Sequence, residues 1–312
     1  MSAGKASLSV NAAVRSRPRG WREHYQPDLR RAWYVHLLHS RAAMVSIIVL
    51  AAIGFAAVFA PIVAPQDPTL IEPADRLKSP SWDHLLGTDD LGRDILSRLI
   101  YGGRVSLVVG VAVTVVSGIV GTILGLTAGF YRRLDGLIMR TMDGFMAFPG
   151  ILLAIAVVIS FGARQTSVIL ALSLVYAPVV ARLMRGMTIV IRELPYVEAA
   201  RSIGLRDDQI LRRYVFANAI SPLIVQAAFV AAYAILAEAS LSFLGASVNP
   251  ETPTWGNMLR DGQRLLSRAW WMAITPGVVL FVTVLSLTLF GDALRDALDP
   301  RSNERRKDGM PK

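Results

Sequence analysis

Residues that could carry out catalysis are few in this sequence and lie apart from one another. The four histidines (His24, His36, His39 and His84) stand outside the long apolar stretches, and none has paired carboxylates at metal-ligand spacing. The apolar stretches contain no Ser–His, Asp–Asp or metal-binding set, and the chain has no Gly-x-x-x-x-Gly-Lys-Ser/Thr phosphate loop. The sequence therefore predicts a protein without catalytic residues, without a metal site and without ATP hydrolysis of its own.

Three aspartates close together, Asp89, Asp90 and Asp94, could bind a hard cation through their carboxylates. Arg93 stands among them and would neutralise part of their charge directly. The pattern therefore favours a solvated loop held by salt bridges over a cation site.

Glu238 is the one acidic residue well inside a long apolar stretch. Ionisable residues at such positions are rare because a charge is costly in hydrocarbon, and they usually have a function. Two interpretations remain open. The carboxyl group either forms a hydrogen bond to a neighbouring helix or a partner subunit, or it lines a path across the membrane.

The elements that must position these residues are long apolar segments. The chain has 312 residues, of which 53% are hydrophobic and 18% charged, and its apolar runs are long enough to span a bilayer. The sequence predicts an all-α polytopic membrane protein with six transmembrane helices, at residues 42–64, 105–130, 144–162, 166–188, 222–245 and 270–289. Gly121, Gly125 and Gly129 recur at four-residue spacing and predict a smooth face for close helix packing.

The basic residues indicate the orientation. The net charge is +10, but Lys and Arg lie between the apolar runs rather than on one soluble face, so we expect no nucleic-acid binding. Alternate segments carry 24 basic residues on one side of the membrane and 9 on the other. The positive-inside rule then puts both termini in the cytoplasm. The absence of cysteine excludes disulfides and thiolate metal sites.

This assignment divides the chain into three parts. Residues 1–41 are expected to form a cytoplasmic tail ending in an interfacial helix against membrane lipid, residues 42–291 the six-span domain, and residues 292–312 a second cytoplasmic tail. The connections are predicted at residues 65–104 (extracytoplasmic), 131–143, 189–221 (cytoplasmic) and 246–269.

One part of the cytoplasmic connection, residues 193–214, is a polar, helix-forming island between apolar segments. Glu198 lies near the start of a predicted helix that Gly204 interrupts. Residues 205–214 are predicted to form a second short helix. Such a helix pair either lies on lipid headgroups or docks on a partner.

This island resembles the EAA loop of ABC importer permeases, in which three residues separate Glu-Ala-Ala from a glycine. The matching residues here are Glu198, Ala199, Ala200, Gly204, Ile210, Leu211 and Asn218. The resemblance implies that they form a coupling helix that docks on a cytoplasmic ATPase. The family often has proline before the asparagine, and this sequence has Ala217, which leaves the exit geometry of the second helix open.

Further segments resemble one branch of these permeases, the DppC/OppC type found in dipeptide, oligopeptide and nickel importers. They are residues 39–45, 59–68, 86–94 and 291–301. Together with the EAA loop, these motifs occur in the expected order and on the expected sides of the membrane, so the resemblance covers nearly all of residues 38–301.

The resemblance implies a type I ABC importer permease-like fold and a permease subunit in the bacterial inner membrane. Its partners would be a second homologous permease (DppB/OppB type), two cytoplasmic ABC ATPase subunits and an extracytoplasmic substrate-binding protein. ATP and Mg would bind to the ATPases, so no cofactor is expected in this chain. The substrate stays open among a dipeptide, an oligopeptide, a nickel complex and another small solute. An ion-coupled secondary transporter, the alternative, would normally have several acids near the membrane midplane.

Overall fold

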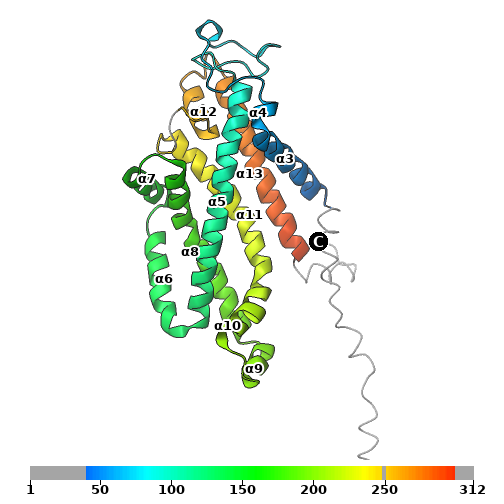
Figure 1. The fold of residues 1–312 in the computed structure, drawn as a ribbon, viewed down its shortest axis with the longest axis vertical. Helices are drawn as coiled ribbons and strands as arrows, with labels where there is room; N and C mark the ends of the chain where they lie inside the picture. Colours follow the sequence, from blue (N-terminus) through cyan, green and yellow to red (C-terminus); the bar gives the residue numbers. More distant parts are fainter. Residues whose placement is uncertain (1–39, 248–250, 299–312) are drawn as a thin grey trace, which may run out of the picture.

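The computed structural model describes residues 40–247 and 251–298, and their regular structure is helical (Figure 1). The elements are α3 (Arg41–Val58), α4 (Ala60–Val63), the short turn η2 (Pro73–Asp75), α5 (Ile95–Phe130), α6 (Arg132–Met146), α7 (Gly150–Phe161), α8 (Gln165–Arg192), α9 (Pro195–Ser202), α10 (Asp207–Ile210), the π-helical turn η3 (Leu211–Phe216), α11 (Ala217–Phe243), α12 (Trp255–Gln263) and α13 (Trp271–Leu298). This confirms the all-α prediction for the described residues. Most of the predicted N-terminal tail and the end of the C-terminal tail lie outside them.

Five continuous helices are long and apolar enough to cross a membrane. They are α3, α5, α8, the run from Asp207 to Phe243, and α13. A sixth span exists if α6 and α7 count together, because these two helices form a pair bent by 90°. Two predictions are wrong here: residues 144–162 are not one helix, and residues 131–143 are not a loop.

The bend between α6 and α7 has a local cause. Pro149 has no backbone N–H and disfavours helical geometry at Phe148, so the chain leaves the helix after Met146. Pro149 is the N-cap of α7 and has an extended ψ of 121°. Two charges of residues 131–143, Asp135 and Asp143, are paired with arginines of α8, and the pattern within one segment does not reveal such partners.

Helices α5 and α8 form the most extensive contact in the described part of the chain. A Cβ atom added to Gly121 would lie 2.6 Å from the Val180 Cβ, and one added to Gly129 would lie 2.6 Å from the Thr188 Cβ. Gly125 faces Met184 in the same way, at 2.7 Å. The predicted smooth packing face is therefore confirmed, and it brings the two backbones close together.

The connection before α5 is more ordered than the sequence suggests. Asp94 caps α5 by accepting a hydrogen bond from the Ser97 N–H at 2.8 Å, so the helix begins ten residues before the predicted span. The indole of Trp271 at the start of α13 donates to the Thr88 carbonyl at 3.2 Å. These contacts fold the α4–α5 loop (residues 64–94) onto the ends of the bundle.

Asp89 and Asp94 of the α4–α5 loop are paired but are buried rather than solvated. Arg93 donates to Asp89 at 2.7 Å, and Arg98 lies 3.5 Å from the same carboxylate. Asp89 is 5% exposed and Asp94 is 2% exposed, so the prediction of a solvated loop is wrong. Their burial follows from contacts with helices that are distant in the sequence. Among the described residues, no three His, Asp or Glu side chains are placed to hold a metal ion.

Further differences concern helix ends. Helix α13 continues to Leu298, so its last turns occupy the start of the predicted C-terminal tail. Helix α12 forms within the predicted polar loop at residues 246–269, and the indole of its buried Trp255 donates to the Leu99 carbonyl at 3.0 Å.

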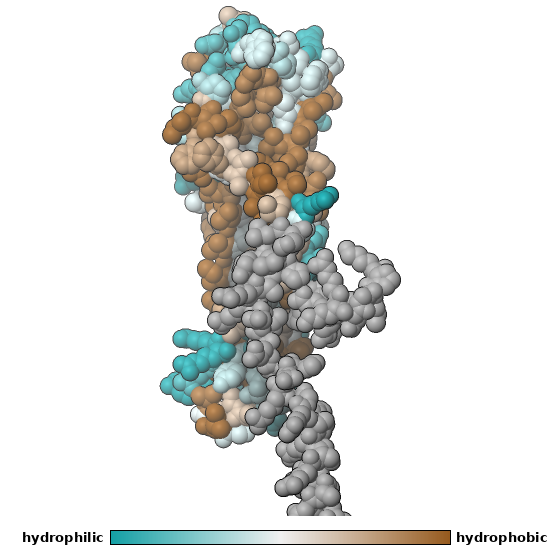
Figure 2. Space-filling model, turned by 90° about the vertical axis from the view of Figure 1, so that its right-hand side faces the viewer, coloured by the Kyte–Doolittle hydropathy of each residue, from teal (hydrophilic) through white to brown (hydrophobic). Residues whose placement is uncertain are grey.

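The surface of the bundle separates into polar ends and an apolar middle. Figure 2 shows this on the side formed by α3 and α13, where hydrophobic residues lie between hydrophilic groups at the two ends. Ile48, Phe55 and Val58 of α3 are each at least 60% exposed. An exposed apolar belt of this kind is what contact with lipid hydrocarbon requires. The α8–α11 connection and the α4–α5 loop lie at opposite ends of the bundle (Figure 1).

Candidate functional site

Helix α9 begins with a local signal for helix formation. Leu194 is its extended N-cap, and Pro195 follows at the first helical position, where its missing N–H costs nothing. Glu198 stands in the first turn and is exposed. A carboxylate there interacts favourably with the positive end of the helix dipole.

The end of α9 is a Schellman motif built on Gly204. The Gly204 N–H donates to the Arg201 carbonyl at 2.9 Å, and the Leu205 N–H donates to the Ala200 carbonyl at 3.2 Å. Gly204 has φ +82°, a left-handed conformation that a residue with a Cβ adopts only at a cost. The prediction that this glycine permits the turn is confirmed. No atom lies within 4 Å of an added Cβ, so the demand is conformational and not steric.

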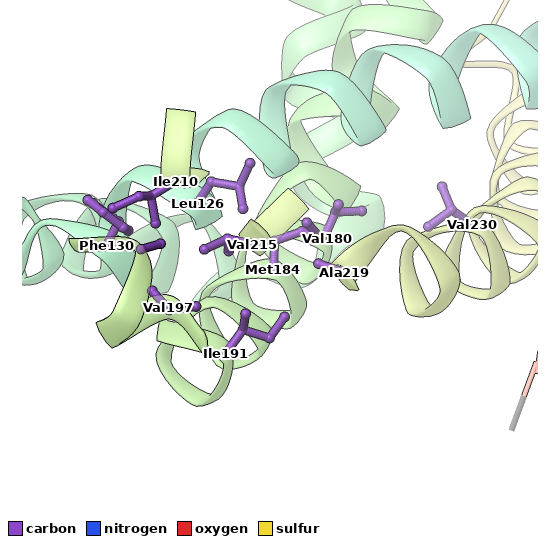
Figure 3. Close-up of a cluster of buried hydrophobic side chains, with 11 residues drawn as sticks. Leu126, Phe130, Val180, Met184, Ile191, Val197, Ile210, Val215, Ala219 and Val230 are labelled. Carbon is purple, nitrogen blue, oxygen red and sulfur yellow. The ribbon is translucent and has the colours of Figure 1, made fainter. Parts of the chain in front are cut away.

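The predicted coupling residues divide into a buried set and an exposed set. Ala200 is 3% exposed and Ile210 is fully buried, both within an apolar cluster that also contains Val197 and Phe130 (Figure 3). Leu211 is half-buried and packs against this cluster. The side chains available to a partner are those of Glu198, Ala199 and Asn218, beside the exposed Gly204. Because Ala200 is small and buried, it lets α9 pack closely against the other helices of this subunit.

The predicted second helix does not exist as a separate element. From Asp207 the chain is helical without a break to Phe243, and it includes the π turn η3. Ala217 explains the continuity, because a residue with a backbone N–H can continue a helix where a proline would interrupt its hydrogen bonds. Asn218 donates from its side chain to the Tyr214 carbonyl at 2.6 Å, which gives it a place in the helix itself.

Contacts from three directions fix α9 to the bundle. The rings of Tyr196 and Tyr214 stack with centroids 6.2 Å apart, and the Arg201 guanidinium lies 5.4 Å from the Phe130 ring centre. Helix α9 also packs on the end of α8, where Arg192 donates to the Gly129 carbonyl of α5 at 2.6 Å. Helix α9 is thus held against α5, α8 and the start of the α11 run.

Glu238 lies in the interior of the chain. Its side chain is fully buried and accepts hydrogen bonds from Ser106 of α5 at 2.8 Å and from Ser242 at 2.7 Å. This is the hydrogen bond to a neighbouring helix that the sequence allowed. A role on a path across the membrane stays a prediction.

Sequence reasoning missed a second group of charged residues, on α6 and α8. Asp143 accepts from Arg182 at 2.8 Å, and Asp135 accepts from Arg185 at 2.6 Å. The sequence did contain a signal for these pairs, because Arg182 and Arg185 follow an apolar run. The pairs were missed because Asp135 and Asp143 were assigned to a loop.

Comparisons with known proteins agree with this architecture. Residues 117–304 match the family described as binding-protein-dependent transport system inner membrane component, and residues 29–80 match the N-terminal TM domain of oligopeptide transport permease C. A putative peptide transport system permease protein of Brucella suis biovar 1 is 43% identical over 88% of this chain and 94% of its own length.

Two further relatives are similar over almost the whole chain. The dipeptide transport system permease protein DppC of Alkalihalophilus pseudofirmus is 38% identical over 90% of both chains. The glutathione transport system permease protein GsiD of Pectobacterium atrosepticum is 40% identical over 95% of this chain and 97% of its own.

The chain therefore belongs to the family of binding-protein-dependent transport permeases. Within that family it is an ABC importer permease of the DppC/OppC type. It is a multi-pass membrane protein and a transport component, and the family assignment supports this function over an ion-coupled secondary transporter.

Proposed function

We propose that this chain is one of two permease subunits in an ATP-driven importer of peptides in the bacterial inner membrane. The relatives are named for the transport of peptides, dipeptides and glutathione, which supports a short peptide as the solute. A second homologous permease completes the pathway, an extracytoplasmic binding protein delivers the peptide, and two ATPase subunits supply the energy. ATP and Mg bind to those ATPases, because this sequence has no phosphate loop.

The observation that carries this proposal is the combination of exposure and rigid support at α9. Glu198 and Ala199 face outward, whereas Val197 and Ala200 on the opposite side of the helix are buried in the bundle. A lone surface helix in contact with lipid would present its main apolar side to the membrane, but the Val197 and Ala200 side of α9 packs inside the bundle. The outward side combines the charged Glu198, the small Ala199 and the exposed Ile203, and it is the surface available for docking on an ATPase.

Coupling follows from this attachment. When the two ATPases close on ATP, α9 moves with them and carries α5, α8 and α11, against which it packs. The cavity shared with the second permease then changes its side of access. ATP can shift this equilibrium only by as much as its binding energy differs between the two states.

The orientation follows from the basic residues, of which the α9 side carries the larger share. Ser202 of α9 and Ser81 of the α4–α5 loop are both exposed, and the chain has no native cysteine. In intact cells, an impermeant thiol reagent should label Ser81→Cys and leave Ser202→Cys unlabelled. The reverse pattern would overturn the orientation.

The docking role is tested by the variant Glu198→Lys. We expect this subunit to insert and pair with the second permease, while peptide uptake stops and the ATPases no longer co-purify, because the reversed charge faces the docking surface. Glu72→Lys makes the same charge change at an exposed site in the α4–α5 loop and serves as the matched control. Near-normal uptake and ATPase recovery for Glu198→Lys would remove the coupling role of α9.

A further inference from the structure

Glu238 of α11 is a buried acidic residue to which the proposed function gives no role. Its side chain is 0% exposed, and its two carboxyl oxygens lie 2.8 Å from the Ser106 hydroxyl of α5 and 2.7 Å from the Ser242 hydroxyl of α11. Within the described residues, these are the only hydrogen bonds that the carboxyl group makes. The group therefore lies at the junction between α5 and α11.

The two hydroxyl groups are directed at this carboxyl group rather than at the backbone. Thr114, Ser240 and Thr283, like other hydroxyl residues of the long helices, donate to the carbonyl four residues earlier. Such a local bond satisfies a hydroxyl group within a helix. Ser106 and Ser242 instead form their hydrogen bonds with Glu238. Side chains from two helices thus converge on one acid.

Helix α12 closes this junction off from solvent. A Cβ atom added to Gly256 would lie 2.6 Å from the Ser242 Cβ, so α12 packs directly on the part of α11 that contains Glu238. The Trp255 ring lies against α5, where a Cβ atom added to Gly103 would be 2.9 Å from it. Bulk water and a partner subunit therefore reach the carboxyl group only if these helices move apart.

Among the described residues, no cation pairs with Glu238. In the neighbouring α5 and α12, Arg98 and Arg260 each pair with an aspartate, and Arg104 is exposed. The charged residues of α8 and α13 lie in the C-terminal halves of these helices, away from the α4–α5 loop near which Glu238 lies. Helices α7 and α11 have no further charged residue. A negative charge at this position would therefore be buried without compensation.

An ionised carboxylate would fit this site poorly. It can accept about four hydrogen bonds and here has two partners, and burial without a counter-charge strongly disfavours the charged form. The protonated acid has one O–H donor and one carbonyl acceptor, which provides one group for each of the two hydroxyls. Since a hydroxyl group can accept as well as donate, both distances fit this arrangement.

We propose that Glu238 is a proton-binding site. The acid stays protonated and neutral in the folded protein and, through Ser106 and Ser242, joins α5 to α11 beneath α12. This inference goes beyond the proposed function and holds for any solute, because it rests on the geometry of this chain alone. It assigns Glu238 to the packing of the bundle, so this residue neither presents a charge to the solute nor exchanges its proton during transport.

Infrared spectroscopy distinguishes the two states of a carboxyl group, because only the protonated acid has a carbonyl stretching band above the amide region. The assembled transporter is measured at neutral pH in a detergent without ester groups, so that lipid carbonyls do not overlap with this band. We expect the difference between the natural transporter and Glu238→Gln to contain the band, which moves to lower frequency in D2O. Glu72→Gln changes an exposed glutamate of the α4–α5 loop, and its difference spectrum should lack the band.

Two further measurements sharpen this test. Ser106→Ala removes one hydrogen-bond partner, so it should move the band to higher frequency without abolishing it. The band should also persist from about pH 6 to about pH 9, where an exposed glutamate is ionised. If Glu238→Gln removes only carboxylate bands, or if the acid band disappears within this pH range, the proposal is overturned.

A second assignment of the band covers the case in which Glu238→Gln does not assemble. The natural transporter and Ser106→Ala are then each prepared with glutamate labelled with ¹³C at the side-chain carboxyl group. The label should lower the frequency of an acid band that also differs between these two proteins. If no acid band responds to both the label and the variant, Glu238 is ionised and the proposal is overturned.

Discussion

Charged side chains with a structural role and those available to a partner lie at opposite ends of the bundle. At one end, Asp89 and Asp94 of the α4–α5 loop and Arg98 in the first turn of α5 are almost completely buried and paired with one another or with neighbouring groups. In the α8–α11 connection, Glu198 and Arg201 lie outside, above an apolar cluster that fixes the backbone beneath them. The comparison teaches that charges here support the fold where they are buried and are available to a partner where a rigid helix holds them in solvent.

The strongest test of this contrast is Asp94→Ala at the buried end. The variant loses the N-cap of α5 and leaves His84 without one of its two carboxylate partners. We expect a loss of stability of about 3 kcal/mol or more. Thermal unfolding of the purified complex measures it.

Asp83→Ala serves as the control for this change, because Asp83 belongs to the same loop but is exposed. Its unfolding temperature should stay close to that of the natural protein. An equal drop for both variants would show that burial does not distinguish the charges of this loop.

A smaller effect is expected at the exposed end, from Gly204→Ala. The left-handed conformation at this position should cost the variant about 1 kcal/mol and loosen the end of α9. The affinity for the ATPases should then fall roughly fivefold, while the subunit still assembles with the second permease.

Two further variants sharpen this result. Gly204→Asn should bind the ATPases better than Gly204→Ala, because asparagine tolerates the left-handed region. Gly136 is a glycine inside helix α6 with open space around it. Gly136→Ala should therefore leave ATPase binding unchanged or stabilise α6 slightly. If Gly204→Ala binds the ATPases as tightly as the natural chain, the Schellman turn is not required for docking.

The smallest effect concerns pH and belongs to the α4–α5 loop. Burial opposes protonation of His84, but hydrogen bonds with Asp75 and Asp94 outweigh burial and raise its pKa above the usual 6.5. The pKa of Asp75 lies below its usual 3.8, mainly because of the hydrogen bond from Lys78 and next because of the hydrogen bond with His84.

The signs of these shifts set the stable range. The contribution of His84 is complete below pH 6.5 and is lost as the pH rises through the raised folded-state pKa. The contribution of Asp75 is complete above pH 3.8 and is lost as the pH falls through the lowered one. The unfolding temperature should therefore decline as the pH rises above 6.5 and through the raised pKa of His84, and this decline should be weaker in His84→Gln. An identical pH profile for the variant would exclude His84 as its source.

The sequence allowed the elements that depend on local pattern to be predicted. Apolar runs indicate where helices cross the membrane, the glycine spacing in α5 indicates close packing, and Gly204 indicates a turn, because each property follows from nearby residues. In the candidate site, the motif also predicted Glu198 and Ala199 as docking residues, and both side chains are exposed.

Features that depend on distant partners could not be predicted. Residues 131–143 look like a loop until Arg182 and Arg185 of α8 supply counter-charges for Asp143 and Asp135. Asp89 looks solvated until Arg98 and the ends of α12 and α13 enclose it. Ala200 and Ile210 match a docking motif, but whether a side chain faces inward is decided by the packing of α9 against α5 and α8.

The glycine seam between α5 and α8 has a mechanical consequence. Because Gly121, Gly125 and Gly129 let the two backbones lie close together, we expect the two helices to move as a single stiff lever, and α9 contacts one end of it. Helix α5 has 36 residues and is therefore about 54 Å long, so a tilt of about 5° at the α9 end displaces the opposite end by roughly 5 Å. Small rotations at one membrane face are thus amplified into movements on the scale of a side chain at the other.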